Sequence, residues 1–278
     1  MRRAWVAVLA SVAALGLIAA IAVAQTSPPT VAVTATPTSV TLPVTPVAAG
    51  PTTFTVTRQG TNKGVNVYIA LLVPGVSLDQ FQAALRRDDR SGGESALGLV
   101  SIQASLFVSA DDTSRSVTFT LKPGLTYVVV SEPDTENGPP PSRGIGTFTT
   151  AATANGATAA APGATVRMRG LRFRGDRVLP RNGVVRVTNE DGVPHFALAF
   201  PLRRGVTTAR LRRAVRSGSD RAFGGIVAGQ PYGLQNLISG GDVVNDNQVS
   251  FPRAGRYALI CFFSGHEQLG MYRIVTVR

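Results

Sequence analysis

The sequence is poor in the side chains that form cross-links and metal sites: its 278 residues include one cysteine, two histidines and three methionines. A single cysteine excludes an internal disulfide, so the fold must be stabilised by its hydrophobic core. Lysine is scarce too, because Lys63 and Lys122 are the only two, and arginine supplies nearly all of the formal net charge of +12. No zinc-finger, helix-turn-helix or aromatic RNA-binding signature accompanies that charge, which argues against nucleic acid as a partner.

The N-terminal segment, MRRAWVAVLASVAALGLIAAIAVAQ, is basic and then apolar. Two arginines, an alanine-rich run and an A-x-A site before Gln25 are typical of a secretory signal peptide, which we predict over residues 1–24. The run is also long enough to span a bilayer, so an uncleaved membrane anchor is the alternative. In both cases we expect an exported protein that is periplasmic, at the cell surface or secreted.

Two low-complexity segments divide the rest of the chain. Residues 25–40 are rich in Thr and Pro and carry no charge, which predicts an extended tether. Residues 150–164 are rich in Ala and Thr and predict a linker. We therefore expect two domains, over residues 41–149 and 165–278.

The two predicted domains resemble each other. The segment FTLKPGLTYVVVS parallels SFPRAGRYALIC, and the spacing from Tyr127 to Tyr257 equals that from Gly75 to Gly205. This pattern indicates a tandem repeat of one domain. Short Val-, Thr- and Tyr-rich runs bounded by Gly, Pro, Asn and Asp predict the strands of an all-β sandwich.

A short helix is expected inside each domain. Ser77-Leu-Asp-Gln predicts a capping box at the start of DQFQAALRR, and Thr208 is placed to open ARLRRAVR. The second helix carries Arg210, Arg212, Arg213 and Arg216. These arginines form either a solvated face or a surface that attracts an anionic envelope surface or an acidic redox partner.

The rare residues gather near the C-terminus. Cys261, His266 and Met271 form a Cys-x4-His-x4-Met pattern, and the other histidine, His195, follows a turn rich in Asp and Gly. Thiolate, imidazole and thioether together are the ligand types that suit copper. A chance occurrence of one buried cysteine and nearby polar residues is the alternative, but the chain places its only cysteine and both histidines in one arrangement.

These residues resemble the cupredoxin family of blue copper proteins, which includes plastocyanin and azurin. The Asn189-to-His195 stretch is similar to the family's first histidine motif, and the Cys261 loop is similar to its ligand loop. The resemblance implies two tandem cupredoxin-like Greek-key sandwiches and one type 1 copper ion. Its ligands would be His195 and His266 as imidazoles, Cys261 as thiolate and Met271 as axial ligand. Family members usually carry Asn after the first histidine, where this chain has Phe196.

The repeat places Ser131 opposite Cys261, and Val65 or Asn66 opposite His195. The first domain contains no Cys, His or Met, so we expect it to bind no metal and to act as a spacer or docking module.

We expect one-electron transfer or copper carriage with a protein partner for redox or copper exchange. A metal-free envelope module is the alternative. We do not expect an enzyme, because copper nitrite reductases and multicopper oxidases need more histidines. A thiol hydrolase built from Cys261 and His195, with Asp191 orienting the imidazole, would leave Met271 without a purpose.

Overall fold

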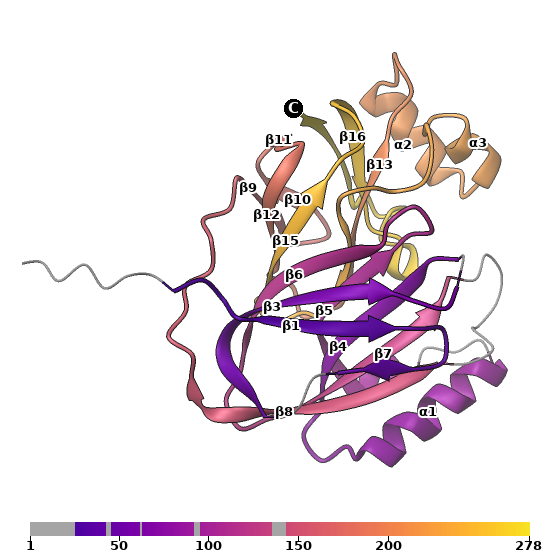
Figure 1. Ribbon diagram of the computed structural model, residues 1–278. Helices are drawn as coiled ribbons and strands as arrows, with labels where there is room; N and C mark the ends of the chain where they lie inside the picture. The colour runs from indigo at the N-terminus through magenta and orange to yellow at the C-terminus, as the bar shows by residue number, and fades with distance from the viewer. Residues whose placement is uncertain (1–25, 43–45, 62, 92–94, 135–142) are drawn as a thin grey trace, which may run out of the picture.

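The structure is a computed structural model that describes residues 26–42, 46–61, 63–91, 95–134 and 143–278 (Figure 1). The predicted signal peptide, residues 1–24, lies outside the described residues. Among the helices that are described, none has the length and apolar character needed to cross a membrane.

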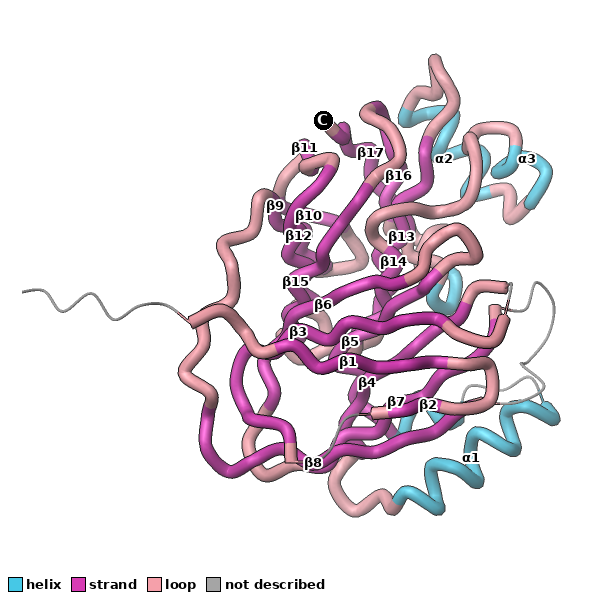
Figure 2. The backbone as a smooth tube through the Cα atoms, viewed as in Figure 1, coloured by secondary structure: helices cyan, strands magenta, loops and turns pink. Residues whose placement is uncertain are grey.

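The first half of the chain folds into two packed layers of strands with α1 against one of them (Figure 2). One layer contains β1, β3 and β6, and the other contains β8, β7, β4 and β5. Aromatic rings fill the space between them: the Phe54 and Phe119 centroids are 5.2 Å apart, and those of Tyr127 and Phe148 are 5.0 Å apart. The elements are β1 (Thr30–Ala35), β2 (Val40–Thr41), β3 (Val47–Arg58), β4 (Val65–Leu72), α1 (Leu78–Ser91), the 3-10 turn η1 (Ser95–Leu99), β5 (Val100–Val108), β6 (Ser114–Leu121), β7 (Thr126–Pro133) and β8 (Gly144–Ala154).

The second half repeats this arrangement with its own core. The sheet β10-β9-β12-β15 faces the sheet β11-β17-β16-β13-β14, and the Phe251 and Tyr257 rings meet between them at 5.0 Å. The elements are β9 (Ala164–Met168), β10 (Phe173–Gly175), β11 (Val178–Leu179), β12 (Asn182–Asn189), β13 (His195–Pro201), α2 (Thr208–Arg216), α3 (Asp220–Gly224), β14 (Gln235–Ile238), β15 (Val243–Ser250), β16 (Gly255–Ile260), the 3-10 turn η2 (Phe263–Gly265) and β17 (Tyr272–Val277).

Strand pairing follows the predicted repeat. Leu71 pairs with Tyr127 in the first half, and Pro201 pairs with Tyr257 in the second, so both partners shift by the same 130 residues. Helices α1 and α2 begin at Leu78 and Thr208, which differ by the same offset. The predicted all-β fold class is confirmed: both halves are built from layers of strands, with α1 in the first half and α2 and α3 in the second.

The helix starts depend on the predicted capping chemistry. The Ser77 N–H donates to Gln80 Oε1 at 2.7 Å and the Gln80 N–H donates to Ser77 Oγ at 3.1 Å, which is a reciprocal capping box. At α2 the capping residue is Thr207, whose Oγ1 accepts from the Arg210 N–H at 3.2 Å. The cap therefore lies one residue before Thr208, which is the first residue of the helix.

Both low-complexity segments contain regular structure, which corrects the prediction of a tether over residues 25–40 and of a linker over 150–164. Strand β1 lies inside the tether and pairs in parallel with β3, with Val31, Val33 and Ala35 buried. Alternating apolar side chains next to an open sheet edge favour a strand, and this outweighs the absence of charge. Strand β8 likewise continues to Ala154. The domain boundaries at 41–149 and 165–278 stay a prediction.

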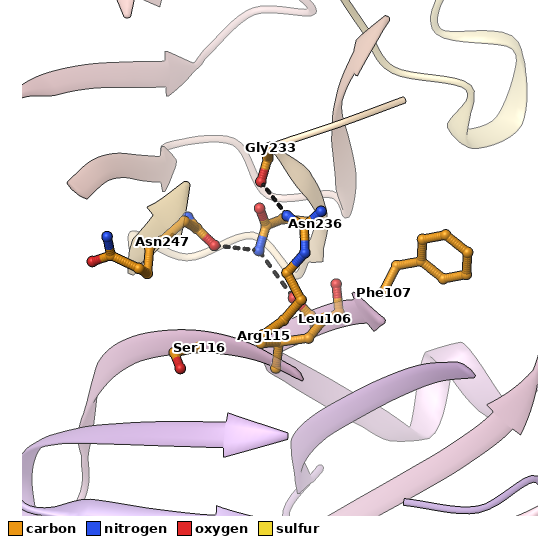
Figure 3. A pocket seen from close by; sticks show the side chains of 9 residues that line it. Leu106, Phe107, Arg115, Ser116, Gly233, Asn236 and Asn247 are labelled. Carbon is orange, nitrogen blue, oxygen red and sulfur yellow. Dashed lines mark hydrogen bonds between the residues drawn. The ribbon is translucent and has the colours of Figure 1, made fainter. Parts of the chain in front are cut away.

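The two halves share a polar, buried junction. Strand β6 pairs with β15, with Val117 opposite Asn247, so one layer of strands continues from the first half into the second. Figure 3 shows the adjoining contacts, in which Asn236 Nδ2 donates to Ser105 O at 3.0 Å and to Asn247 Oδ1 at 2.7 Å. Arg115 also reaches across and donates to Gly233 O at 3.2 Å. These bonds fix the second half on the first.

We expect Asn236→Ala to lower the free energy of unfolding by about 2–3 kcal/mol, because it leaves the buried Ser105 carbonyl and Asn247 amide without their donor. Asn182→Ala is the control, since Asn182 bonds Ser250 on the exposed surface and its loss should cost less than about 0.5 kcal/mol. Urea unfolding of the full chain measures both. Equal effects of the two substitutions would contradict a contribution of the junction to the free energy of unfolding.

Candidate metal centre

Three strand ends bring the predicted ligands to one place. His195 is the first residue of β13, Cys261 directly follows β16, and Met271 directly precedes β17. Strand β16 pairs antiparallel with both β13 and β17. The end of β16 and the starts of β13 and β17 therefore lie side by side at one end of the sheet. The turn η2 between β16 and β17 carries His266 at its end.

The ring nitrogens and the sulfur converge closely. The Nδ1 atoms of His195 and His266 are 3.1 Å apart, and Cys261 Sγ lies 3.8 Å from the first and 3.6 Å from the second. All three side chains are buried. His195 is far from the other two in the sequence, so its arrival here is a result of the fold.

Met271 is the fourth predicted residue, and it is fully buried in the same core cluster as Cys261. Its backbone closes the loop: the Met271 N–H donates to His266 O at 2.9 Å, and the Cys261 N–H donates to Met271 O at 3.1 Å. The loop from Cys261 to Met271 is therefore a compact unit, held at both ends. An axial role for the thioether belongs to the proposal below.

Asp191 fixes the orientation of the His195 ring. Its Oδ2 lies 2.8 Å from His195 Nε2, and its Oδ1 accepts from the Gly170 N–H at 2.8 Å. Although burial opposes it, the hydrogen bonds from Gly170, His195 and Leu171 lower the pKa of Asp191. A carboxylate acceptor places the proton of a neutral imidazole on Nε2 and leaves the Nδ1 lone pair facing Cys261 and His266.

The environment keeps His195 neutral and Cys261 protonated when no metal is bound. Burial lowers the pKa of His195, and the nearby His266 adds to the decrease, while Asp191 opposes it. Burial raises the pKa of Cys261 to about 11, although backbone N–H groups of Phe263 and Phe196 act in the opposite direction. A metal ligand must be a neutral imidazole or a thiolate, so His195 is ready to bind and Cys261 would release its proton on binding.

The loop before His195 is braced from within. Asn189 is fully buried, and its Nδ2 donates to Val193 O at 2.8 Å and to Ile238 O at 3.1 Å. The Phe196 backbone N–H points at Cys261 Sγ at 3.3 Å. Bracing thus comes from Asn189 and from the Phe196 backbone. The sequence alone does not identify Asn189 as a brace, and it indicates Asp191 only as the orienting group of a hydrolase.

A thiol hydrolase fits this geometry poorly. Asp191, His195 and Cys261 do lie in a row, but the Cys261 side chain is completely buried and burial raises its pKa. A nucleophilic cysteine needs a lowered pKa and access to substrate. The hydrolase interpretation also leaves the position of His266 Nδ1 without a purpose.

The donor set fits copper. Two imidazole nitrogens and one thiolate sulfur are the trigonal set of blue-copper sites, with a weak thioether as a fourth contact. The two Nδ1 atoms lie 3.1 Å apart, a separation that either a shared proton or a bound cation would bridge. Throughout the described residues, His195, Cys261 and His266 form the only group of three such side chains whose donor atoms come this close together.

Apolar side chains surround the ligand loop. The Phe263 ring centroid lies 5.7 Å from that of His266, and Phe263 is half-buried. Phe262 packs edge-on against Phe200 and Phe223 but keeps 39% of its surface exposed, and Leu269 is 61% exposed. The loop therefore presents apolar groups to solvent close to His266.

Comparison with known proteins finds similarity among solved structures alone. No family model matches the sequence, and no curated protein matches it. Among solved structures, the chain is similar to auracyanin A, a "blue" copper protein from Chloroflexus aurantiacus, with 22% identity over 41% of this chain and 96% of that one and a TM-score of 0.27. It is also similar to a copper-containing nitrite reductase from Thermus scotoductus, with 10% identity over 91% of this chain and 62% of that one and a TM-score of 0.25. Scores this low carry no argument about function, so the site is interpreted from its own geometry.

Proposed function

We propose that this chain is an exported protein that holds one copper ion in a type 1 site and transfers single electrons. The observation that carries the proposal is the convergence of His195 Nδ1, His266 Nδ1 and Cys261 Sγ within 3.8 Å of one another in a buried site. Met271 is proposed as the axial ligand. Bound copper would supply the one-electron redox couple, and the protein supplies a rigid ligand set.

Rigidity favours electron transfer over copper carriage as the primary function. His195 is bonded to Asp191, whose carboxylate is tied to the backbone of residue 170, and the loop 261–271 is closed by two backbone hydrogen bonds. Ligands held in one geometry need little rearrangement when the charge of the metal changes. A carrier must release its ion, which a buried and braced site disfavours.

The proposed partner surface lies over the ligand loop. Phe262 and Leu269 are exposed there, and α2 packs close by, because Ala214, Val215 and Phe262 line one common surface hollow. Asp220 and Glu267 also line this hollow, and Arg210 and Arg213 of α2 line a neighbouring hollow that shares Ala214 and Ser219 with it. A small apolar contact with charged edges suits weak, transient redox encounters, and the basic edge suits an acidic partner or an anionic envelope surface.

Titration of the full chain with Cu(II) tests the proposal. We expect one equivalent to bind and to give an intense visible absorption from the thiolate-to-copper transition, because the chain has a single cysteine in a His₂Cys set. The number of copper ions bound also tests the expectation that the first half binds no metal, because a second site there would raise the stoichiometry above one. A colourless mixture, with no tight uptake of Cu(I) or Cu(II) by calorimetry, would favour the metal-free envelope module instead.

Removing the carboxylate behind His195 should weaken the site without destroying it. We expect Asp191→Ala to lower copper affinity about 10- to 100-fold, because the ring loses the acceptor that fixes its tautomer and orientation. The visible band should persist at saturating copper. Asp176→Ala is the matched control, since Asp176 also accepts a backbone N–H, but from Thr165, which is not one of the proposed ligands. Unchanged affinity in Asp191→Ala would contradict the orienting role.

A further inference from the structure

A cavity lies beside the metal centre and is lined by residues from both halves of the chain. It has a volume of about 220 Å³ and lies between helix α1 with η1 and the sheet formed by β4, β5 and β7. Its wall is mostly apolar. The lining includes Ala70, Phe81, Leu85, Leu97, Val130 and Leu237.

One end of this cavity is polar, and its side chains are joined by hydrogen bonds. Tyr68 Oη donates to Glu132 Oε1 at 3.0 Å, and Arg143 Nε donates to Glu132 Oε2 at 2.8 Å. Arg143 and Glu132 are 14% and 18% exposed, so this pair is largely withdrawn from solvent. Burial, reinforced by Glu132, raises the pKa of Tyr68 well above its ordinary value, and its hydroxyl therefore stays a donor to Glu132 with an oxygen lone pair still able to accept.

The other side of the cavity belongs to the second half. Phe196 and Phe263 line it, and their ring centroids are 6.3 Å apart. Phe196 follows His195 directly in the chain, and the Phe263 ring lies 5.7 Å from that of His266. A molecule in the cavity would therefore be separated from the proposed ligands by one layer of phenylalanine rings.

We propose that this cavity is a binding site for a small neutral aromatic molecule that carries a hydroxyl group, with the ring among the apolar side chains and the hydroxyl at Tyr68 and Glu132. An apolar chamber with a few polar groups at one end is the usual form of a small-molecule site. The proposal is independent of the copper assignment, because every group it uses belongs to the protein.

The charges at the polar end select the head group. Two carboxyl groups, Asp88 and Glu132, and one guanidinium, Arg143, line the cavity. Asp88 already accepts hydrogen bonds from Ser95 Oγ at 2.6 Å and the Ala96 N–H at 2.7 Å. Carboxylate oxygens accept hydrogen bonds, so a hydroxyl donor has a partner there, whereas a carboxylate ligand would meet an excess of negative charge. Phenol-type molecules should therefore bind better than benzoate-type molecules.

The test uses the full chain without metal, titrated with 4-fluorophenol and separately with 4-fluorobenzoate, and followed by fluorine NMR and calorimetry. We expect the phenol to bind at least about tenfold more tightly than the benzoate, which corresponds to about 1.4 kcal/mol. Proton resonances of the Phe196 and Phe263 rings should shift on binding. Absence of phenol binding, or a preference for the benzoate, would overturn the proposal.

Matched variants locate the site. Leu97→Trp should abolish binding by filling the cavity, while Leu99→Trp should not, because Leu99 lies in the same turn η1 but does not line the cavity. Glu132→Gln should weaken phenol binding about tenfold by removing a charged acceptor, and Glu190→Gln, a partly buried carboxyl on the second half, should leave it unchanged. Circular dichroism of each variant checks folding. Equal affinities in Leu97→Trp and Leu99→Trp would place the ligand elsewhere and overturn the proposal.

Because the titrations are made without copper, their failure and the failure of the copper proposal are distinguishable. A protein that turns blue with Cu(II) but binds no phenol would keep the metal site and lose the cavity site. The reverse result would keep only the cavity.

Discussion

Cys261→Ser is expected to remove the visible absorption of the copper-loaded protein completely, because the band requires a thiolate bonded to Cu(II) and the chain has no other cysteine. Serine is close in shape to cysteine, and the side chain is fully buried, so the fold should survive. The variant should also bind copper at least about a hundredfold more weakly, since two imidazoles alone remain. Visible spectra and competition with a copper chelator measure the two effects.

Ser131 suggests a control for this substitution. It occupies the position equivalent to Cys261 in the first half, is fully buried, and donates to Thr36 O at 2.9 Å. Ser131→Cys should add a thiol but no colour, because no histidine lies in the first half to join it. A coloured Cys261→Ser protein, or a second coloured site in Ser131→Cys, would show that the band does not report the proposed ligand set.

Much of the fold could be predicted from the sequence because its signals are local. Alternating apolar residues specify strands, and the Ser77 capping box specifies the start of α1. The prediction for residues 25–40 was wrong because the composition of this segment was given more weight than its alternation of apolar residues. Val31, Val33 and Ala35 alternate within a charge-free, proline-rich segment, and the structure uses them as a buried strand against β3.

The site could be predicted only in part, for a physical reason. Residue type and rarity indicated His195, Cys261, His266 and Met271, because soft and borderline ligands are chemically distinctive. Asp191 and Asn189 carry no such signature. Asp191 orients His195 only because the backbone of residues 170 and 171 holds its carboxylate, and that contact joins segments distant in the sequence. The cavity beside Phe196 and Phe263 likewise depends on how the two halves are placed.

Met271, the proposed axial ligand, should contribute less to copper binding than an equatorial ligand does. Met271→Leu should keep both copper and colour, because a thioether makes only a weak, long contact while the His₂Cys set supplies most of the binding. Leucine has a similar volume, so the fully buried position should tolerate it at a cost below about 1.5 kcal/mol. The reduction potential should rise, since losing an electron-donating contact disfavours Cu(II).

His195→Ala should behave differently. It removes one of the two ring nitrogens at the site and leaves Asp191 without its partner, so we expect loss of the blue spectrum and a decrease in affinity of more than about a hundredfold, beyond the effect expected for an outer hydrogen bond. Voltammetry, visible spectra and chelator competition compare the two variants, and circular dichroism confirms that each is folded. Equal and total loss of copper in both folded proteins would mean that Met271 binds as strongly as His195, and the division between axial and equatorial ligands would be wrong.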